Sequence, residues 1–521
     1  MSWWNAECRR YKRRLSVLVG RVAANRAAVA LMLAVLSLGG RLLLLPWVPI
    51  PKPAIQDEFS YLLAGDTYAS GRLTNPEHPL WIHFETVHEI MRPTYQSKFF
   101  PAQGMLLSLG QKMFGDPWFG VWLSMGALNV AVYWALAGWL PPRWALLGGL
   151  LALTRVGFLN YWSESYWGGA VAATAGALVI GAVPRLRTNP RLGPALILGI
   201  GLALLANSRP YEGAVLGAAC LGAVLTKVHP RRIAWPLALI LVPTILWMGY
   251  YNYRVTGNPL LLPYQVHETQ YSTSSMFFWD TQFRPPPHYN HEALRQAWVG
   301  WAQGQRVYEH AHPWQVRHSD AIRLDEFYLG LPLTCCVAIF ALPIFLYQRK
   351  LRVALILFLF LVAGLETETT LVPHYAAPGT ALVFILAAGS LRRLWHVAPP
   401  VMAWVVAVAF FFNFLTMAAP ANRWLYDKRD FIARRSSVLQ ELGRAPGKQL
   451  VLVQYGPGHD VNYEWVYNAA DIDRSRIVWA REMGAGKDRE LLDYYHDRKV
   501  WRLVDGGDGV ALSPFDPAAG K

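Results

Sequence analysis

The sequence predicts a mainly α, polytopic membrane protein with about 11–13 transmembrane helices, a large first extracytoplasmic loop and a small C-terminal α/β domain. Three observations support this fold class. The 521 residues are 54% hydrophobic and only 16% charged, whereas soluble domains are about 25% charged. Apolar runs approaching the length of a bilayer crossing recur along most of the chain. Strand-like segments appear only after residue 420.

The N-terminal segment 1–26 is basic and contains RRYKRR at Arg9–Arg14. The first apolar run has no small-residue cleavage signal, so we expect it to stay in place as a membrane anchor. The four cysteines show no metal-like spacing and predict no structural disulfide.

Apolar runs predict a transmembrane domain over residues 27–419, with soft boundaries because several runs are shorter than a perpendicular span of about 20 residues. The runs lie at 27–45, 117–140, 143–160, 167–184, 193–208, 211–226, 233–251, 326–347, 351–366, 374–391 and 399–418.

Basic residues set the predicted topology, because cytoplasmic loops carry an excess of Lys and Arg. With these spans, six basic segments all lie on one side of the membrane, which is the predicted cytoplasmic side. They are Arg9–Arg14, Arg143, Arg185–Arg191, Lys227–Arg232, Arg349–Arg352, and Arg392 with Arg393. The net charge of +15 is therefore scattered over loops, which favours membrane topology and argues against a nucleic-acid partner.

The opposite side then holds the first loop 46–116, a second large loop 252–325 and the C-terminal domain 420–521. The segment Phe100–Gly115 would break this parity if it crossed the membrane, so we predict an interfacial or re-entrant helix there. The second loop has little periodicity, and its Tyr, Trp, His and Pro content suits either a lid over a head group or a packed surface loop.

The C-terminal domain is predicted as a small parallel α/β unit. Strands are expected at 449–455, 476–482 and 499–505, with helices near Val461–Ala470 and Asp488–Tyr495. The sequence YGPGHD after the first strand lacks the spacing of a nucleotide-binding loop, so a Gly/Pro turn is the favoured interpretation.

The first loop opens with PKPAIQDEFSYLLAGD, which places Asp57 and Glu58 directly after the first span. Apolar residues at helical spacing predict a helix that lies flat on the membrane and ends at Gly71. Asp57 and Tyr61 are four residues apart and share a face of this helix. A structural alternative is that Asp57 caps the helix, although capping does not account for Glu58.

Cations on the same side are candidates for holding a phosphate. Arg92 and Lys98 lie in the first loop, and Arg209 lies in NSRPYEG between two apolar runs. Charged groups at membrane depth are costly and tend to face a cavity. The structural alternatives are a lipid-headgroup contact for Arg92 and an ion pair with Glu212 for Arg209.

Further candidates for substrate contact are Tyr61, Glu164, His374 and Tyr375. Glu164 could equally be a solvated loop carboxylate, and His374 could serve packing. The first-loop histidines are poorly patterned as metal ligands, because His83 and His88 are five residues apart. No metal site is therefore assigned; a divalent metal stays possible without being indicated, and no cofactor is certain.

Residues 30–420 resemble the GT-C membrane glycosyltransferases, which include protein O-mannosyltransferases and aminoarabinose transferases. The resemblance is carried by QDEFSYLLAGD after the first span, NYWSESYWGG at Asn160–Gly169 and VPHYAAP at Val372–Pro378. It implies a hexosyl- or pentosyltransferase in the bacterial inner (plasma) membrane. Its donor would be a polyprenyl-phosphate sugar, and its acceptor an extracytoplasmic lipid, glycan or protein.

The resemblance also implies residue roles. An inverting transfer needs a base for the acceptor hydroxyl and cations for the departing phosphate. By carry-over from the family's acidic pair, Asp57 is the candidate base, and Glu58 would position the acceptor or the base. The family motif does not fix the cations, so Arg92, Lys98 and Arg209 are the candidate phosphate ligands because of their predicted place on the outer side.

Two other functions fit part of the pattern. A transporter or flippase for a lipid-linked sugar would share the spans, but it would normally place polar residues at mid-membrane. A glycan ligase is closer in chemistry. Release of free polyprenyl phosphate from a monosaccharide donor distinguishes these possibilities.

Overall fold

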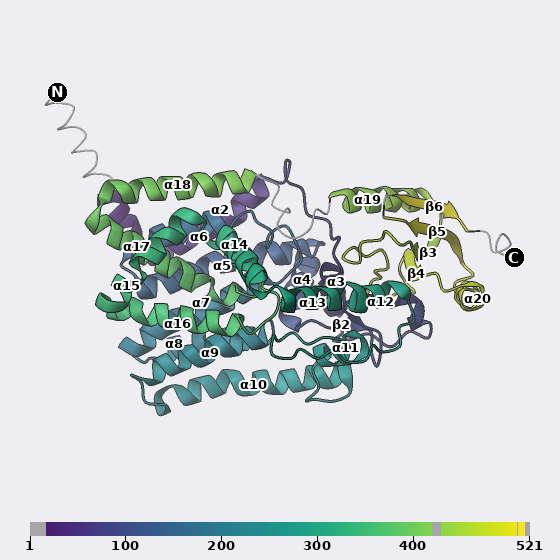
Figure 1. Cartoon of the computed structure of the whole chain (residues 1–521), viewed down its shortest axis with the longest axis horizontal. Helices are drawn as coiled ribbons and strands as arrows, with labels where there is room; N and C mark the ends of the chain where they lie inside the picture. Colours follow the sequence, from purple (N-terminus) through teal and green to yellow (C-terminus); the bar gives the residue numbers. More distant parts are fainter. Residues whose placement is uncertain (1–16, 419–428, 508, 516–521) are drawn as a thin grey trace, which may run out of the picture.

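A computed structural model describes residues 17–418, 429–507 and 509–515. The predicted basic segment Arg9–Arg14 and the predicted domain boundary at 420 lie outside the described residues. Long helices run side by side in a bundle, and a four-stranded sheet lies beyond one end of it (Figure 1). The protein is therefore mainly α-helical with a small sheet domain, as predicted.

The bundle is made of helices that match the apolar runs, because each of the eleven runs overlaps a bundle helix. These are α2 (Arg26–Leu43), α5 (Trp118–Trp139), α6 (Pro142–Val156), α7 (Gly169–Thr188), α8 (Leu192–Ala206), α9 (Pro210–Leu225), α10 (Arg231–Thr256), α15 (Leu331–Tyr347), α16 (Arg349–Leu365), α17 (Thr380–Val397) and α18 (Pro399–Ala418).

Within the described residues, four of these helices have the length and hydropathy of a membrane span: α2, α5, α7 and α10. The bent pair of α14 (Pro313–Tyr328) and α15 gives a fifth if it is counted as one span. These helices fit a multi-pass membrane protein, while the total of about 11–13 spans stays a prediction.

Helix α7 lies at the centre of the bundle, where 83% of its most apolar window is buried. Its small residues allow neighbouring backbones to approach closely, as is common between membrane helices. At Gly176, an added Cβ would lie 2.0 Å from the carbonyl oxygen of Pro378. A side chain larger than hydrogen would therefore push α7 away from the turn that precedes α17.

Basic residues from separate loops share one end of the bundle. Arg26, Arg185 and Lys350 lie close enough together to interact electrostatically. The turns between α15 and α16 and between α17 and α18 lie at the end away from the sheet (Figure 1). This arrangement agrees with the prediction that the basic segments share a side, and which side is cytoplasmic stays a prediction.

One predicted run is broken. The run 326–347 does not form one helix, because α14 and α15 meet at an angle of 105°. Gly330 at the bend has a φ of 74°, a left-handed conformation that glycine adopts without steric cost. The chain therefore leaves α14 and turns sharply into α15.

The first loop contains α3 (Gln56–Ala69) and α4 (Pro101–Phe114), which pack against each other. Gly71 follows α3 with a φ of 75°, as expected for the predicted end of this helix. Eleven of the 14 residues of α3 are buried. The expectation that α3 lies against the lipid is therefore wrong, because α4 and the C-terminal domain cover it. The prediction of a helix over Phe100–Gly115 is confirmed as α4.

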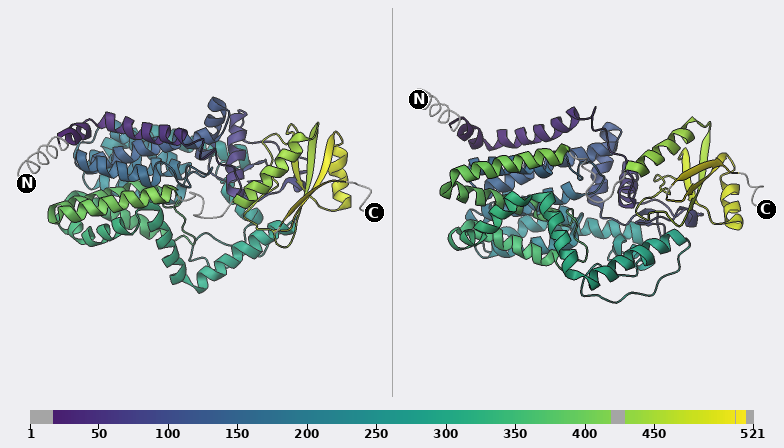
Figure 2. Two further views of the ribbon diagram at one scale, coloured as in Figure 1. Left: turned by 90° about the horizontal axis from the view of Figure 1, so that it is seen from above. Right: turned by 45° about the horizontal axis from the view of Figure 1, so that its top comes forward.

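The second large loop contains α11 (Pro263–Tyr271), α12 (Glu292–Arg295), a π-helical turn at Gln296–Ala302, and α13 (Gln303–Ala311) before α14. In the view from above, α13 and α14 form an elbow that projects sideways from the end of the bundle (Figure 2).

The C-terminal sheet has the strand order β4-β3-β5-β6. Strands β3 (Lys448–Tyr455), β4 (Ile477–Arg481) and β5 (Arg498–Asp505) are parallel, as predicted, and β6 (Val510–Pro514) is antiparallel to β5. Helices α19 (Arg429–Arg444) and α20 (Ala485–Tyr494) belong to the same domain, and α20 confirms the prediction near Asp488–Tyr495.

The helix predicted near Val461–Ala470 is wrong. This segment is irregular, and two of its backbone amides bind the first loop instead of forming helical hydrogen bonds. Glu464 N–H donates to the carbonyl oxygen of Ala54, and Ala470 N–H donates to Asp66. Tertiary pairing with the first loop therefore replaces the local helix.

Candidate functional site

A cavity of about 540 Å³ lies where the first loop, the second loop and the outer turns of the bundle meet. Of the nine predicted site residues, six line it. They are Asp57, Tyr61, Lys98, Arg209, His374 and Tyr375. Residues far apart in the sequence therefore converge on one space.

Asp57 is the second residue of α3, and its side chain is 33% exposed. The helix cap is Ile55, so the alternative that Asp57 caps the helix is wrong. Among the residues that the structure describes, Asp57 forms no ion pair with a lysine or an arginine. Burial raises its pKa to about 6, while Lys98 and Arg209 oppose this rise. Asp57 is therefore ionised at neutral pH yet more basic than an ordinary aspartate.

Glu58 has a different role from Asp57. Its Oε2 accepts hydrogen bonds from the backbone amides of Ala54, at 3.1 Å, and Ile55, at 3.2 Å. It is fully buried and does not line the cavity, so the expectation that it positions the acceptor is not supported. By fixing the first turn of α3, Glu58 can position Asp57 instead.

Lys98 enters the cavity from the first loop, just after β2 (Gln96–Ser97). Its Nζ lies 3.4 Å from Oε1 of Glu268 and over the rings of Tyr264 and Trp298, at 4.7 and 5.4 Å from their centroids. Burial lowers the pKa of Lys98, while Glu268 and Asp57 raise it. An ammonium group with three donors keeps further N–H groups for a bound anion.

Glu268 on α11 completes this pair. Burial raises its pKa, but Lys98 and the neighbouring hydrogen bonds outweigh that effect and lower it to about 2. The carboxylate is therefore charged and balances Lys98. No local sequence pattern predicts this pairing, because 170 residues separate Lys98 and Glu268.

Arg209 lies in the short turn between α8 and α9. Its guanidinium carbon is 4.4 Å from the ring centroid of Tyr375, and its Nη1 is 3.7 Å from Oε1 of Glu212. The alternative interpretation, an ion pair with Glu212, is therefore present in the structure. The Arg209 side chain also lines the cavity, so it can pair with Glu212 and still face a bound ligand.

Aromatic rings form much of the remaining wall. Tyr61 stacks on Phe99 with centroids 4.3 Å apart. His374 accepts or donates a hydrogen bond of 2.9 Å to the hydroxyl of Tyr161 and packs on Trp167 at 5.0 Å. His374 therefore has the packing role that was its alternative, and it also faces the cavity.

Besides Glu58, two further predicted residues lie outside the cavity. Arg92 has a side chain that is 57% exposed, and it pairs with Glu77 at 2.8 Å. Glu164 is buried and pairs with Arg41 through two contacts of 2.8 and 3.0 Å. Arg92 is therefore removed from the phosphate ligands. Glu164 is neither a solvated carboxylate nor a substrate contact, because it braces α2 against the loop after α6.

The cavity also contains residues that sequence reasoning missed. The most informative are His88, Glu268, Trp298 and Glu368. Burial and the nearby Glu212 raise the pKa of Glu368 to about 9, so this carboxyl is neutral at neutral pH and can donate a hydrogen bond. The high Trp, His and Tyr content of the second loop was the only sequence signal for part of this set.

In the described part of the chain, no group of three or more His, Cys, Asp or Glu side chains has the arrangement of a metal site. The first-loop histidines are dispersed. His78 contacts Asp473, at 3.2 Å; His83 contacts the carbonyl oxygen of Arg481, at 3.2 Å; and His88 lies beside Asp57.

The chain matches no family model and no curated protein. Its fold is similar to that of an oligosaccharyltransferase from Archaeoglobus fulgidus solved with Zn and sulfate. The two share 12% identity over 92% of this chain and 68% of the other, with a TM-score of 0.50. ArnT from Cupriavidus metallidurans in the apo state shares 13% identity over 90% of this chain and 92% of its own, with a TM-score of 0.51.

ArnT bound to undecaprenyl phosphate has a TM-score of 0.49 at 13% identity, over 92% of both chains. The oligosaccharyltransferase and ArnT are GT-C glycosyltransferases. This chain shares the fold of the oligosaccharyltransferase and of ArnT in the apo state, which agrees with the resemblance of its sequence to GT-C glycosyltransferases.

Proposed function

We propose that this protein is a membrane glycosyltransferase that moves one sugar from a polyprenyl-phosphate donor to an extracytoplasmic acceptor. The observation that carries this proposal is the cavity in which Asp57 faces two cations. Lys98 and Arg209 come from different loops, and both are close enough to Asp57 to lower its pKa. A base and an anion site are the two groups that glycosyl transfer from a phosphate needs.

The proposed reaction is a single displacement. The acceptor hydroxyl oxygen attacks C1 of the sugar while Asp57 takes the hydroxyl proton. The bond between C1 and the phosphate oxygen breaks, and the electron pair leaves with the phosphate. Attack opposite the leaving group inverts C1. Cations stabilise the negative charge that grows on the departing phosphate.

Lys98 and Arg209 are the proposed phosphate ligands. Their carboxylate partners lie at 3.4 and 3.7 Å, which is longer than a strong charge-assisted hydrogen bond. A phosphate can therefore recruit the N–H groups of both side chains. Tyr61 and Tyr375 offer ring faces and hydroxyl groups for the sugar, and Glu368 offers a donor.

The donor class fits the place of the cavity. It lies at the end of the apolar bundle nearest the sheet domain, where a buried polyprenyl tail would present its head group. We propose that this end faces the outside of the inner (plasma) membrane. The proposed sugar is a hexose or a pentose, and the proposed acceptor is a lipid, glycan or protein.

The test is a release assay with purified protein. A panel of polyprenyl-phosphate hexoses and pentoses, each with a radiolabelled sugar, is incubated with membrane extract as the acceptor source. The expected result is free polyprenyl phosphate together with labelled acceptor. Movement of intact donor across vesicles without release would instead show a transporter or flippase, and would refute the proposal.

A further inference from the structure

The segment 462–470 of the C-terminal domain packs along α3, the helix that carries Asp57. We call this segment the clasp. Ile55, the residue before α3, is extended and forms an antiparallel bridge with Tyr463. On either side of this bridge, Gln56 N–H donates to the carbonyl oxygen of Asn462, at 3.2 Å. Glu464 N–H donates to that of Ala54, at 3.4 Å. The backbone next to Asp57 is therefore paired with a segment about 400 residues later.

The clasp continues along α3. Phe59 lies 4.7 Å from the ring of Tyr467 and 4.7 Å from the guanidinium carbon of Arg435. At the other end of the helix, Ala470 N–H donates to Oδ2 of Asp66, at 2.8 Å. The helix is thus held along its whole length on the side that faces the sheet domain.

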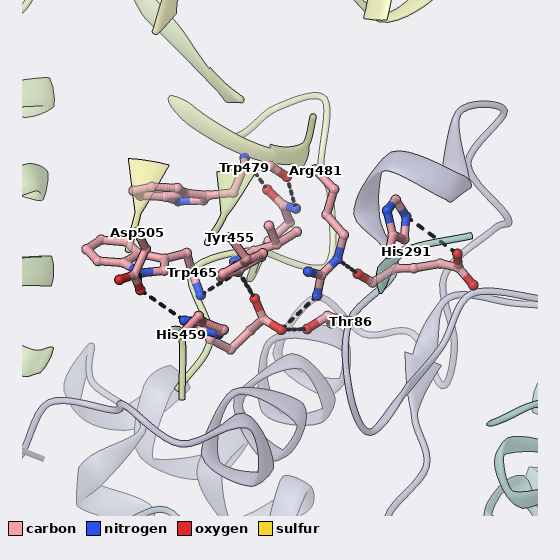
Figure 3. Close-up of polar contacts among 12 residues, drawn as sticks. Thr86, His291, Tyr455, His459, Trp465, Trp479, Arg481 and Asp505 are labelled. Carbon is pink, nitrogen blue, oxygen red and sulfur yellow. Dashed lines mark hydrogen bonds and ion pairs between the residues drawn. The ribbon is translucent and has the colours of Figure 1, made fainter. Parts of the chain in front are cut away.

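Glu464 anchors the clasp inside the C-terminal domain (Figure 3). Its Oε2 accepts hydrogen bonds from Thr86 of the first loop, at 2.6 Å, and from Arg481 of β4, at 2.9 Å. Its Oε1 accepts from the hydroxyl of Tyr455 and from Val466 N–H. The carboxylate and the Arg481 side chain are only 5% and 4% exposed.

The same network reaches the second loop. Arg481 Nε donates to the carbonyl oxygen of Glu85 in a contact drawn in Figure 3. The Glu85 carboxylate in turn accepts from Tyr271 at the end of α11, at 2.8 Å, and from Asn290, at 2.7 Å. Arg481 therefore joins the sheet to both loops that form the cavity.

We propose that Glu464 is a positioning residue that fixes Asp57 in the cavity by holding the strand pairing between residues 54–56 and 462–464. This inference rests on the proposed function. It assigns the C-terminal domain a role in aligning the base, although none of the residues that the structure describes in this domain lines the cavity. Misplacement of a reacting group by about 1 Å can cost on the order of 100-fold in rate.

The first variant is Glu464→Gln. An amide cannot accept all four hydrogen bonds, and its NH₂ group faces other donors, so the pairing with residues 54–56 should loosen. We expect at least tenfold faster deuterium exchange at Gln56 and Glu58. We also expect kcat to fall at least tenfold while donor KM stays within threefold. Asp497→Asn, which loses an exposed pair with Lys448, is the matched control and should change neither.

The pH profile separates positioning from general loss of structure. A loosened Asp57 becomes more hydrated, so its pKa should fall and the acid limb of kcat should move to lower pH. Lys98, Arg209, Glu58 and His88 face this carboxylate and are unchanged in the variant. A variant that is only partly unfolded would have a lower kcat at every pH, but the acid limb of its pH profile would stay at the same pH.

A second pair of variants covers the case in which Glu464→Gln does not fold. Tyr467→Leu removes the ring that packs against Phe59, whereas Tyr467→Phe keeps it. We expect faster exchange and lower kcat in the first variant and recovery in the second. Unchanged exchange in folded Glu464→Gln or Tyr467→Leu protein, or faster exchange with normal kcat, would overturn the inference.

The two proposals fail differently. If wild-type protein releases no polyprenyl phosphate from any donor, the proposed function is wrong. Deuterium exchange around residues 54–58 still decides whether the clasp fixes the start of α3, because this measurement needs no substrate.

Discussion

Oδ1 of Asp57 and Nε2 of His88 lie 3.5 Å apart in the wall of the cavity. Burial, together with Lys98 and His267, lowers the pKa of His88 well below its usual value, so the ring is neutral at neutral pH. A neutral ring adds no positive charge beside the carboxylate. Lys98 and Arg209 are therefore the cations that limit the rise in the pKa of Asp57.

Asp57→Asn should remove most transferase activity. General-base catalysis contributes about 10²–10⁴-fold, and an amide cannot take the acceptor proton. Since Asp57 is not the helix cap, the melting temperature should stay close to that of the wild type. Release of polyprenyl phosphate and thermal unfolding are measured on the same preparation. An active Asp57→Asn protein would leave the site without its base.

The pH dependence of kcat should follow Asp57. The base works only when deprotonated, so activity should rise with pH through about 6. Lys98 lowers the pKa of Asp57, so Lys98→Met should raise that pKa and move the acid limb to higher pH. Arg209→Gln should move it in the same direction. A limb that stays at the same pH in both variants would assign the titration to another group.

Arg209 should contribute to donor affinity, whereas Arg92 should not. Arg209→Ala should weaken donor affinity about 10- to 100-fold, the range expected for a lost charge-assisted hydrogen bond. Arg209→Lys keeps the charge but loses the planar fork, so the loss should be smaller. Arg92→Ala is the control, because this exposed side chain lies outside the cavity. Equal effects at both positions would contradict the assignment.

Glu164 should matter for stability more than for binding. Glu164→Ala leaves Arg41 buried without its carboxylate, and breaking a buried ion pair costs about 3–5 kcal/mol. The expected result is a clearly lower melting temperature with donor KM unchanged in the protein that remains folded. Glu292→Ala is the control, because it removes an exposed pair with Arg295 and should leave the melting temperature nearly unchanged.

The C-terminal domain should lie outside the cytoplasm. The basic segments place their loops inside, so an odd number of spans should separate the N-terminus from the sheet domain. A reporter that is active only in an oxidising compartment, fused after Lys521, should be active. A fluorescent reporter that needs the cytoplasm should be dark at the same position. The reverse result would invert the topology.

The sequence was sufficient for the bundle helices and for much of the cavity. Apolar runs are dictated by the lipid environment, so each run overlaps a bundle helix, although the run 326–347 also covers the bend between α14 and α15. Asp57 and Tyr61 share a helical face by spacing alone, and both line the cavity. Lys98 was a candidate because a charged side chain beside a membrane is costly and tends to face a cavity.

The missing parts depend on contacts between distant segments. Lys98 pairs with Glu268 across 170 residues, and no local pattern marks such a pair. Segment 461–470 has enough regular spacing to suggest a helix, but its amides bind Ala54 and Asp66 instead. Arg92 was misassigned because charge and position do not reveal which way a side chain points.

The bridge between Ile55 and Tyr463 also sets an order of events during biosynthesis. The segment before Asp57 is made early, whereas its partner strand is made about 400 residues later. During chain elongation, the first loop must wait without this pairing until the last part of the chain has been translated and delivered to the same side. The aligned base is therefore a late product of synthesis, and an unfinished chain should not consume its lipid-linked substrate.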